Sequence, residues 1–403
     1  MKSVVFLCDG MADWQIPSLD NRTPLDVARH PFMDALARDA ARFGLTRTVP
    51  EGMPAGSDVA NLSVFGFDPR TVYTGRSPLE AASIGIDLLP DDVTYRCNLV
   101  TLSDAPSLEE ASMVDYSAGE ISSEEAAVLI AYLNERFETA EHALVHGFSY
   151  RHILLLHHAQ TGAVLTPPHD ISGQSVRGKL PQGQNSALMR ALMQFSYDAL
   201  KCHPINLQRV AAGKHPANCV WFWGEGRRPK LPLFQDAYGV QGAVISAVDL
   251  IRGIGTCAGM EVLKVEGATG TYKTNFLGKA QACIEAFERD VPYVYIHMEA
   301  PDECGHQHQL KEKIFAIEQI DTWVISPVWE YLQKTGEPYR ILLMPDHPTP
   351  IEIMTHVPDP VPFVLYTKGD HANRACRYTE SDAMASGDFL PEAFRLTAML
   401  LAK

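Results

Sequence analysis

The chain has 403 residues, 46% of them hydrophobic, and a formal net charge of −15. Single hydrophobic cores rarely grow beyond about 250–300 residues, so this length predicts two domains. The acidic balance argues against a protein that binds the phosphate backbone of nucleic acid and against a basic membrane-binding surface, although a local basic pocket can still hold a small anion.

Cysteine usage and hydropathy argue against further classes of protein. The eight cysteines include no Cys-x-x-Cys pair, which favours neither a zinc ribbon nor a disulfide-rich scaffold. No segment reaches the roughly 18 consecutive apolar residues that a transmembrane helix needs. We therefore expect a cytoplasmic protein without nucleic-acid or membrane partners.

The first predicted element is a buried β-strand over residues 3–8, which ends at Asp9. Its apolar run is too short for the core of a signal peptide. Asp9 has two interpretations: a turn or helix-cap aspartate, or a ligand at the carboxyl edge of a sheet, where α/β proteins build their sites. An amphipathic pattern over residues 23–40 then predicts a helix.

A loop rich in Gly and Pro over residues 48–56 leads to Ser57, which precedes a segment able to form a helix. As an N-cap, Ser57 would only satisfy free backbone donors. As a nucleophile, it would sit where a helix N-terminus stabilises a phosphate or developing negative charge. The Gly-x-Ser-x-Gly pattern of serine hydrolases does not occur at this position.

From about residue 86 onward the hydropathy pattern changes, and it predicts short strands mixed with helices. Strands are predicted over 94–102, 142–148 and 151–158, and helices over 122–137 and 185–200. A segment of this kind, placed between two halves of an α/β core, predicts an inserted smaller α+β domain at residues 86–235. The core would then consist of residues 1–85 and 236–403.

Several polar residues of the inserted segment stand in unusual places. Arg96 and Arg151 lie at the starts of apolar runs, and His169 and Asp170 follow a Pro-Pro turn. The simplest interpretation of each arginine alone is a surface ion pair.

Alternating strands and helices return from about residue 236. Strands are predicted over 242–246, 261–269, 291–298 and 338–344, and helices over 247–258, 275–290 and 312–334. The strand at 291–298 is followed by Asp302 and His306, which one helical turn would bring to the same side. The strand at 338–344 is followed by Asp346 and His347, and His356 lies just beyond.

Three predicted strands thus place aspartates at one edge of a sheet, at Asp9, Asp302 and Asp346. Carboxylate and imidazole ligands without thiolates suit Mn²⁺, Zn²⁺ or Mg²⁺. Two such ions could activate an oxygen nucleophile, for which Ser57 is the candidate, and neutralise the oxygens of a transferring phosphoryl group. The arrangement favours a hydrolytic or phosphotransfer enzyme.

Longer motifs then support a family resemblance over nearly the whole chain. These motifs are CDGMAD, PAGSDVANLSVFGFDP, YTGRSPLEAA, RCNLVTL, YRHILL, TPPHDISG, GATGTYKTNFLGKA, HMEAPDECGHQ, EKIFAIEQID and MPDHPTP. With them the chain resembles the archaeal-type, bisphosphoglycerate-independent phosphoglycerate mutases of the alkaline phosphatase superfamily. The resemblance implies an alkaline-phosphatase-like α/β fold, a mostly parallel sheet flanked by helices, with an inserted smaller α+β cap domain.

The resemblance also implies the roles of individual residues. One divalent metal ion would be held by Asp9, Ser57, Asp346 and His347, and a second by Asp302, His306 and His356, with His371 as the alternative to His356. The native ion could be Mn²⁺, Zn²⁺ or Mg²⁺, and no bisphosphoglycerate would be needed. Substrate would be bound in the cap domain by Arg96, Arg151, His169 and Asp170, supported by Arg76 and Arg227.

The implied reaction is a step of glycolysis and gluconeogenesis, the interconversion of 3-phosphoglycerate and 2-phosphoglycerate. Ser57 would take the phosphoryl group, glycerate would reorient, and its 2-hydroxyl would attack the phosphoserine. Lys273 and the segment HQHQL after Gly305 depart from the family pattern and bear on the substrate. The alternatives are a phosphotransferase acting on another alcohol, of the proposed homoserine kinase type, a phosphatase, or a binding protein that has lost its chemistry.

Overall fold

The computed structural model describes residues 1–402, which divide into two compact units. The first unit comprises Met1–Tyr73 and the chain from Lys230 onward, and the second comprises Thr74–Pro229. The expected boundaries at 85/86 and 235/236 are therefore displaced. Helix α5 (Ser77–Ser83) packs on strands of the second unit, whereas Phe234 packs on Tyr293 of the first.

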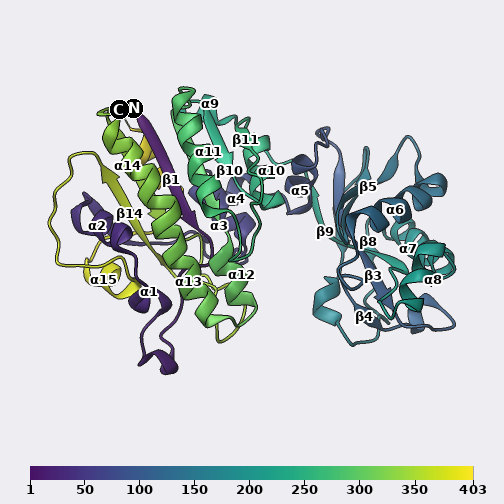
Figure 1. Cartoon of the computed structure of the whole chain (residues 1–403). Helices are drawn as coiled ribbons and strands as arrows, with labels where there is room; N and C mark the ends of the chain where they lie inside the picture. Colours follow the sequence, from purple (N-terminus) through teal and green to yellow (C-terminus); the bar gives the residue numbers. More distant parts are fainter. Residues whose placement is uncertain (403) are drawn as a thin grey trace. The chain divides into compact units, whose positions relative to one another are not determined.

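The first unit is built on a sheet that has eight strands within the described residues, in the order β11, β10, β12, β1, β13, β14, β2, β15. Strands β1, β10, β11 and β14 of this sheet are labelled in Figure 1. Their bounds are β1 (Lys2–Cys8), β2 (Arg42–Thr46), β10 (Gly242–Ile245), β11 (Glu261–Leu263), β12 (Tyr293–Met298), β13 (Tyr339–Met344), β14 (Val361–Thr367) and β15 (Phe389–Leu390). Only β14 of these runs against the others, so the sheet is mostly parallel, as predicted.

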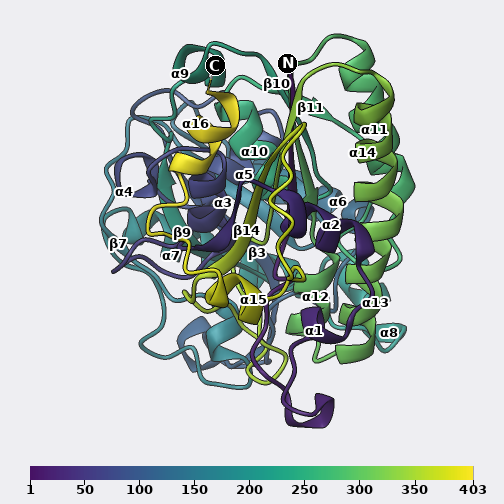
Figure 2. The same ribbon diagram turned by 90° about the vertical axis from the view of Figure 1, so that its left-hand side faces the viewer.

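Helices cover both faces of this sheet, which is why its central strands are buried along almost their whole length. One face packs against α2 (Pro31–Asp39), α11 (Phe276–Glu288), α13 (Leu310–Ile320) and α14 (Ser326–Lys334). Figure 2 shows α11 and α14 on one side of the strands, and α3 (Ser57–Val64), α10 (Asp249–Cys257) and α16 (Arg395–Leu401) on the other. The shorter helices of this unit are α1 (Pro24–Val27), α4 (Pro69–Val72), α9 (Phe234–Tyr238), α12 (Ala300–His306) and α15 (Glu380–Ala385).

Two of the predicted helices differ in detail from the structure. The helix expected over 23–40 is divided into α1 and α2, because a residue that precedes proline avoids the helical conformation, and His30 before Pro31 adopts φ −135°. The helix expected over 312–334 contains a π-helical turn, Asp321–Ile325, between α13 and α14. The buried Asp321 carboxylate accepts the free backbone N–H groups of Phe32 and Met33 at the start of α2.

The second unit is an α+β structure with its own core. Strand β3 (Val93–Leu102) is completely buried and pairs antiparallel with β6 (Arg151–Leu156), with β9 (Cys219–Arg227) and, at its C-terminal end, with β4 (Met113–Asp115). Strand β5 (His142–Phe148) completes this sheet, and β7 (Ala163–Val164) pairs with β8 (Gln182–Gly183). Helix α6 (Ser123–Phe137) packs on β5 and α7 (Ser186–Leu200) on β9, with α8 (Pro204–Ala211) following α7.

None of the helices within residues 1–402 combines the length and the apolar character needed to cross a bilayer.

Candidate metal centre and nucleophile

The carboxyl ends of three neighbouring strands bring together the three predicted aspartates. Asp9 follows β1 directly, Asp346 lies two residues after β13, and Asp302 lies in α12, which follows β12. All three side chains are buried. The prediction that these strand ends share one edge of the sheet is confirmed by the pairing of β1 with both β12 and β13.

The first cluster of candidate ligands consists of Asp9, Asp346 and His347, whose ligand atoms lie within 4.8 Å of one another. Nε2 of His347 is 3.2 Å from Oδ2 of Asp346 and 3.6 Å from Oδ1 of Asp9. The hydroxyl of Ser57 lies 3.0 Å from the same Nε2. A nucleophile, two carboxylates and an imidazole therefore converge on one point.

The second cluster contains Asp302, His347 and His356. Nε2 of His356 lies 3.3 Å from Oδ1 of Asp302, and Nε2 of His306 lies 3.3 Å from Oδ2 of the same carboxylate. The two Nε2 atoms of His306 and His356 are 2.8 Å apart. Asp302 and His306 lie on the same side of α12, as the sequence spacing predicted.

The sequence left open whether His356 or His371 is the last ligand of the second metal ion, and the position of His371 helps to decide this. His371 is exposed and acts electrostatically on Asp39, in the first unit's α2. His356, by contrast, stacks on His347 with ring centroids 3.8 Å apart. The geometry thus favours His356 as the ligand.

Ser57 is the first residue of α3, and the N-cap position belongs to Gly56, which has no side chain to form a cap. The interpretation of Ser57 as an N-cap is therefore wrong. Its hydroxyl points instead to His347, at the N-terminal end of a helix, where partial positive charge stabilises an anion.

The pKa values of one carboxylate in each cluster are shifted in opposite directions. Burial and the neighbouring carboxylates Asp346 and Asp302 raise the pKa of Asp9 well above its usual value. Burial acts in the same direction on Asp302, but hydrogen bonds from His306 and His356 hold the pKa of Asp302 well below its usual value. A cation beside Asp9 would offset the cost of burying that carboxylate.

The residues present fit divalent metal ions. Oδ1 of Asp9 is buried without a hydrogen-bond partner, an arrangement that is costly unless a ligand completes it. Asp346 is held in place by the backbone N–H groups of Gly10 (3.1 Å) and His347 (2.9 Å), both to Oδ1. The donor set of carboxylate oxygens and imidazole nitrogens is the one expected for Mn²⁺, Zn²⁺ or Mg²⁺.

His297 is a residue of this centre that the sequence reading missed. It lies in β12, is completely buried, and its Nε2 contacts Oδ2 of Asp9 at 2.8 Å. Nδ1 of His297 lies 3.2 Å from the hydroxyl of Ser246, which follows β10. Burial lowers the pKa of His297 to about 3. Hydrogen-bonded partners of this kind orient metal-binding carboxylates.

Two buried lysines were also missed. Lys279 of α11 donates to the backbone carbonyl of His297 at 2.8 Å, and burial lowers its pKa to about 8. Lys313 of α13 donates to Oδ2 of Asp13 at 2.7 Å and to the carbonyl of Thr349 at 2.8 Å. A lysine at an inward position of an amphipathic helix is the sequence signal that could have identified both, because lysine is almost never fully buried without a partner.

Comparison with known proteins places the chain in a family. A family model described as 2,3-bisphosphoglycerate-independent phosphoglycerate mutase matches residues 39–206. The protein of that name from Methanothrix thermoacetophila is 47% identical over 402 residues, covering 100% of both chains. The chain belongs to this family. Membership implies an isomerase that depends on a divalent metal ion.

Solved structures agree with the fold of this phosphoglycerate mutase family. A protein from Pyrococcus horikoshii matches with a TM-score of 0.82 and 29% identity, covering 99% of this chain and 96% of that one. A cofactor-independent phosphoglycerate mutase from Thermoplasma acidophilum matches with a TM-score of 0.65 and 22% identity, covering 100% of this chain and 99% of that one. The architecture of the two units is thus that of the mutase family.

The second unit gathers three of the predicted substrate-binding residues around Glu80. Arg76 and Arg96 each place Nε 2.9 Å from a Glu80 carboxylate oxygen. Burial opposes ionisation of Glu80, but the charges of Arg96, Arg76 and Arg151 keep the pKa of this carboxyl below its usual value. Three guanidinium groups around one carboxylate leave a net positive cluster.

Trp223 of β9 links this cluster to His169. The guanidinium of Arg96 lies 3.9 Å from the centre of a Trp223 ring, and the His169 ring packs edge-on at 5.1 Å. Asp170 is exposed beside His169. Arg227 lies elsewhere, where its guanidinium donates to the carbonyl of Ala159 at 2.7 Å. The structure therefore brings Arg76, Arg96, Arg151 and His169 together, but not Arg227.

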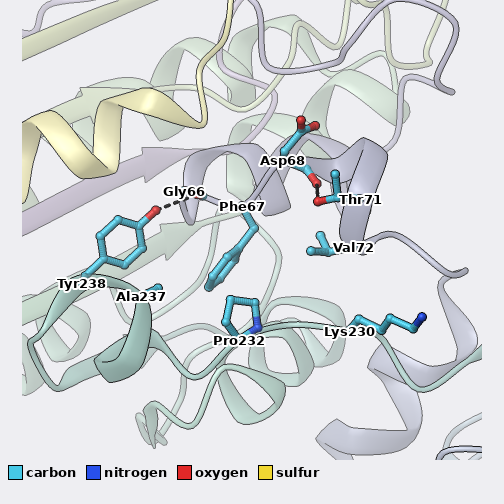
Figure 3. Close-up of a pocket in the computed structure, with 9 residues that line it drawn as sticks. All are labelled: Gly66, Phe67, Asp68, Thr71, Val72, Lys230, Pro232, Ala237 and Tyr238. Carbon is cyan, nitrogen blue, oxygen red and sulfur yellow. Dashed lines mark hydrogen bonds between the residues drawn. The ribbon is translucent and has the colours of Figure 1, made fainter.

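A separate hollow in the first unit has a volume of about 450 Å³ (Figure 3). It is lined by Gly66, Phe67, Asp68, Thr71, Val72, Lys230, Pro232, Ala237 and Tyr238. The Tyr238 hydroxyl donates to the carbonyl of Gly66 at 2.6 Å, and Asp68 pairs with Arg70 at 2.8 Å. The lining includes neither Ser57 nor any candidate metal ligand, so we assign it no part in the mutase reaction.

Proposed function

We propose that this chain interconverts 3-phosphoglycerate and 2-phosphoglycerate without bisphosphoglycerate, with Ser57 as the phosphoryl acceptor. The observation that supports this most directly is the hydroxyl of Ser57 at 3.0 Å from Nε2 of His347, which contributes to both ligand clusters. The family relatives bear the name of this activity.

Two divalent metal ions complete the proposed site. Asp9, Ser57, Asp346 and His347 would hold one ion, and Asp302, His306 and His356 the other. When bound, the ions supply positive charge that neutralises the oxygens of a transferring phosphoryl group and favours an ionised serine hydroxyl. Mn²⁺, Zn²⁺ and Mg²⁺ all accept these ligands.

The chain's own residues then perform the transfer in two steps. Ser57 Oγ forms a bond to phosphorus as the bond from phosphorus to the 3-oxygen of the substrate breaks, and that oxygen takes up a proton. After glycerate reorients, its 2-hydroxyl loses a proton and attacks the phosphoserine, which restores Ser57. The N-terminus of α3 stabilises the negative charge at Ser57 in both steps.

We assign the binding of glycerate to the second unit, which would act as the cap domain. The residues concerned are Arg76, Arg96, Arg151, His169 and Asp170, whereas Arg227, whose guanidinium donates to the carbonyl of Ala159, is left out. The positive cluster around Glu80 supports the assignments of Arg76, Arg96 and Arg151, and the neighbouring ring of His169 supports the fourth, since a carboxylate ligand pairs well with guanidinium groups. A role in cytoplasmic glycolysis and gluconeogenesis follows from this activity.

A coupled assay tests the proposal. The purified, Mn²⁺-loaded protein is given 3-phosphoglycerate without bisphosphoglycerate, and in parallel homoserine with ATP, with release of inorganic phosphate followed in both. Formation of 2-phosphoglycerate is expected. Formation of phosphohomoserine or free phosphate alone would show the alternative, a phosphotransferase acting on another alcohol or a phosphatase, which nothing in the comparisons favours.

Removal of metal should abolish turnover. Treatment with a chelator followed by gel filtration is expected to lower the mutase rate at least about 100-fold, because the charge of the transferring phosphoryl group is then not neutralised. Re-addition of Mn²⁺, Zn²⁺ and Mg²⁺ in separate samples identifies the ions that restore the rate. Circular dichroism of the metal-free protein serves as the control for folding, and full activity of that protein would contradict the metal dependence.

A further inference from the structure

Asn61 lies in the interior of α3, one turn after Ser57, and its side chain is completely buried. Asparagine is a weak helix former, because its side chain competes for backbone hydrogen bonds. A buried amide is also costly unless its polar atoms are paired. Packing alone would therefore favour an apolar residue at this position, and the contacts of the amide must explain the asparagine.

The Asn61 amide joins three groups of the first unit. Its nitrogen Nδ2 donates to the backbone carbonyl of Ser57 at 2.9 Å and to Oδ2 of Asp346 at 2.8 Å. Its oxygen Oδ1 accepts from the hydroxyl of Tyr295 at 2.7 Å. The backbone carbonyl of Ser57 can only accept hydrogen bonds, so the amide nitrogen has to face Ser57, and the same nitrogen then reaches Asp346. The Tyr295 hydroxyl is then the donor to Oδ1.

Tyr295 is held in place independently of this hydrogen bond. It lies in β12 and is fully buried, and its ring stacks on Phe65 with a centroid distance of 4.1 Å and an interplanar angle of 14°. Phe65 follows α3 directly. The stacking fixes where the hydroxyl lies, so the hydroxyl can set the orientation of the Asn61 amide.

We propose that Asn61 is a positioning residue that fixes Ser57 relative to Asp346, and that Tyr295 holds the Asn61 amide in the orientation this requires. The effect on turnover rests on the proposed function. The effect on metal binding does not, because it follows from the hydrogen bond between Asn61 and a candidate metal ligand. Removal of such a partner typically weakens metal affinity or activity about 10- to 100-fold.

Three variants test this role. Tyr295→Phe removes one hydroxyl and keeps the ring that stacks on Phe65, and Asn61→Ala removes the whole amide. Tyr293→Phe is the matched control, because Tyr293 lies two residues earlier on the same face of β12 and packs on Phe234 with a centroid distance of 4.6 Å. Calorimetric titration of the metal-free proteins with Mn²⁺ is the first readout. The kcat and KM for 3-phosphoglycerate at saturating Mn²⁺ are the second.

We expect Tyr295→Phe to bind Mn²⁺ about tenfold more weakly, and Asn61→Ala about 10- to 100-fold more weakly, than the Tyr293→Phe control. At saturating Mn²⁺, kcat should also fall about tenfold or more in both variants with KM nearly unchanged, because the reacting group is displaced. If Asn61 had a purely structural role, the variants would have a lower melting temperature, but kcat would not fall while KM stayed unchanged.

The proposal is overturned if the folded Tyr295→Phe variant binds Mn²⁺ as tightly as Tyr293→Phe. Should Asn61→Ala fail to fold, Tyr295→Phe decides the question alone. If the unmodified chain binds Mn²⁺ but does not convert 3-phosphoglycerate, the proposed function fails, and the titration still decides the role of Asn61.

Discussion

Replacement of Ser57 by alanine is expected to abolish turnover while Mn²⁺ remains bound. A nucleophile that forms a covalent intermediate cannot be replaced by its neighbours, and loss of such a group lowers kcat by more than about 10⁴-fold in enzymes of this kind. The carboxylates and imidazoles of both clusters are unchanged in the variant, so most of the metal-binding contacts persist. The coupled assay and calorimetric titration measure the two effects on the same protein.

A matched control is available on the same helix. Ser63 lies in α3, and its hydroxyl bonds to the carbonyl of Thr48, away from both clusters. Ser63→Ala should therefore lose some stability but keep its rate. Mass spectrometry of protein quenched during turnover is expected to find a phosphoryl group on the peptide that contains Ser57 in the Ser63→Ala variant and none in Ser57→Ala. Turnover retained by Ser57→Ala would exclude the covalent mechanism.

The sequence was sufficient to predict the strands that build the site. Each of β1, β12 and β13 is a predominantly apolar segment that is followed by an acidic turn, the pattern of a buried parallel strand with a ligand at its carboxyl end. The pairing of Asp302 with His306 was also predictable, because it depends only on the four-residue spacing within α12.

Residues that act across the fold were not predictable in this way. His297 contacts Asp9 across a separation of 288 residues, and nothing in the local pattern of β12 distinguishes it from a core histidine. Asn61 and Asp346 are 285 residues apart. Their roles depend on which strands are neighbours, and this information is absent from any single segment.

The boundaries of the two units could not be predicted from local sequence either. Helix α5 follows the first unit in sequence but packs on β3 and β9, so the contacts that assign it to the second unit come from residues as distant as β9. Strand β14 is not among the predicted elements. It contains Pro362, and proline normally argues against a strand that has neighbours on both sides.

Replacement of Lys313 by methionine is expected to lower the free energy of unfolding of the first unit by about 3 kcal/mol, because a buried carboxylate then loses its partner. The side chains of Lys313 and Asp13 are almost completely buried, and their ion pair joins α13 to the loop after β1. In the variant, the Asp13 carboxylate still accepts hydrogen bonds from the backbone N–H groups of Trp14 (2.8 Å) and Ile351. The expected loss of stability is therefore at the lower end of the range observed when a buried ion pair is broken. Urea unfolding followed by circular dichroism measures the change.

A double-mutant cycle separates the pair from its surroundings. Lys313→Met combined with Asp13→Asn should recover much of the lost stability, because the double variant leaves no unpaired buried charge. Lys334→Met removes an exposed pair with Glu330 at 3.6 Å and should change stability by less than about 0.5 kcal/mol. Equal destabilisation by Lys313→Met and Lys334→Met would show that the buried pair does not stabilise the fold.

Because Lys313 also holds the carbonyl of Thr349, whose hydroxyl donates to Asp302, Lys313→Met should in addition bind Mn²⁺ more weakly than Lys334→Met.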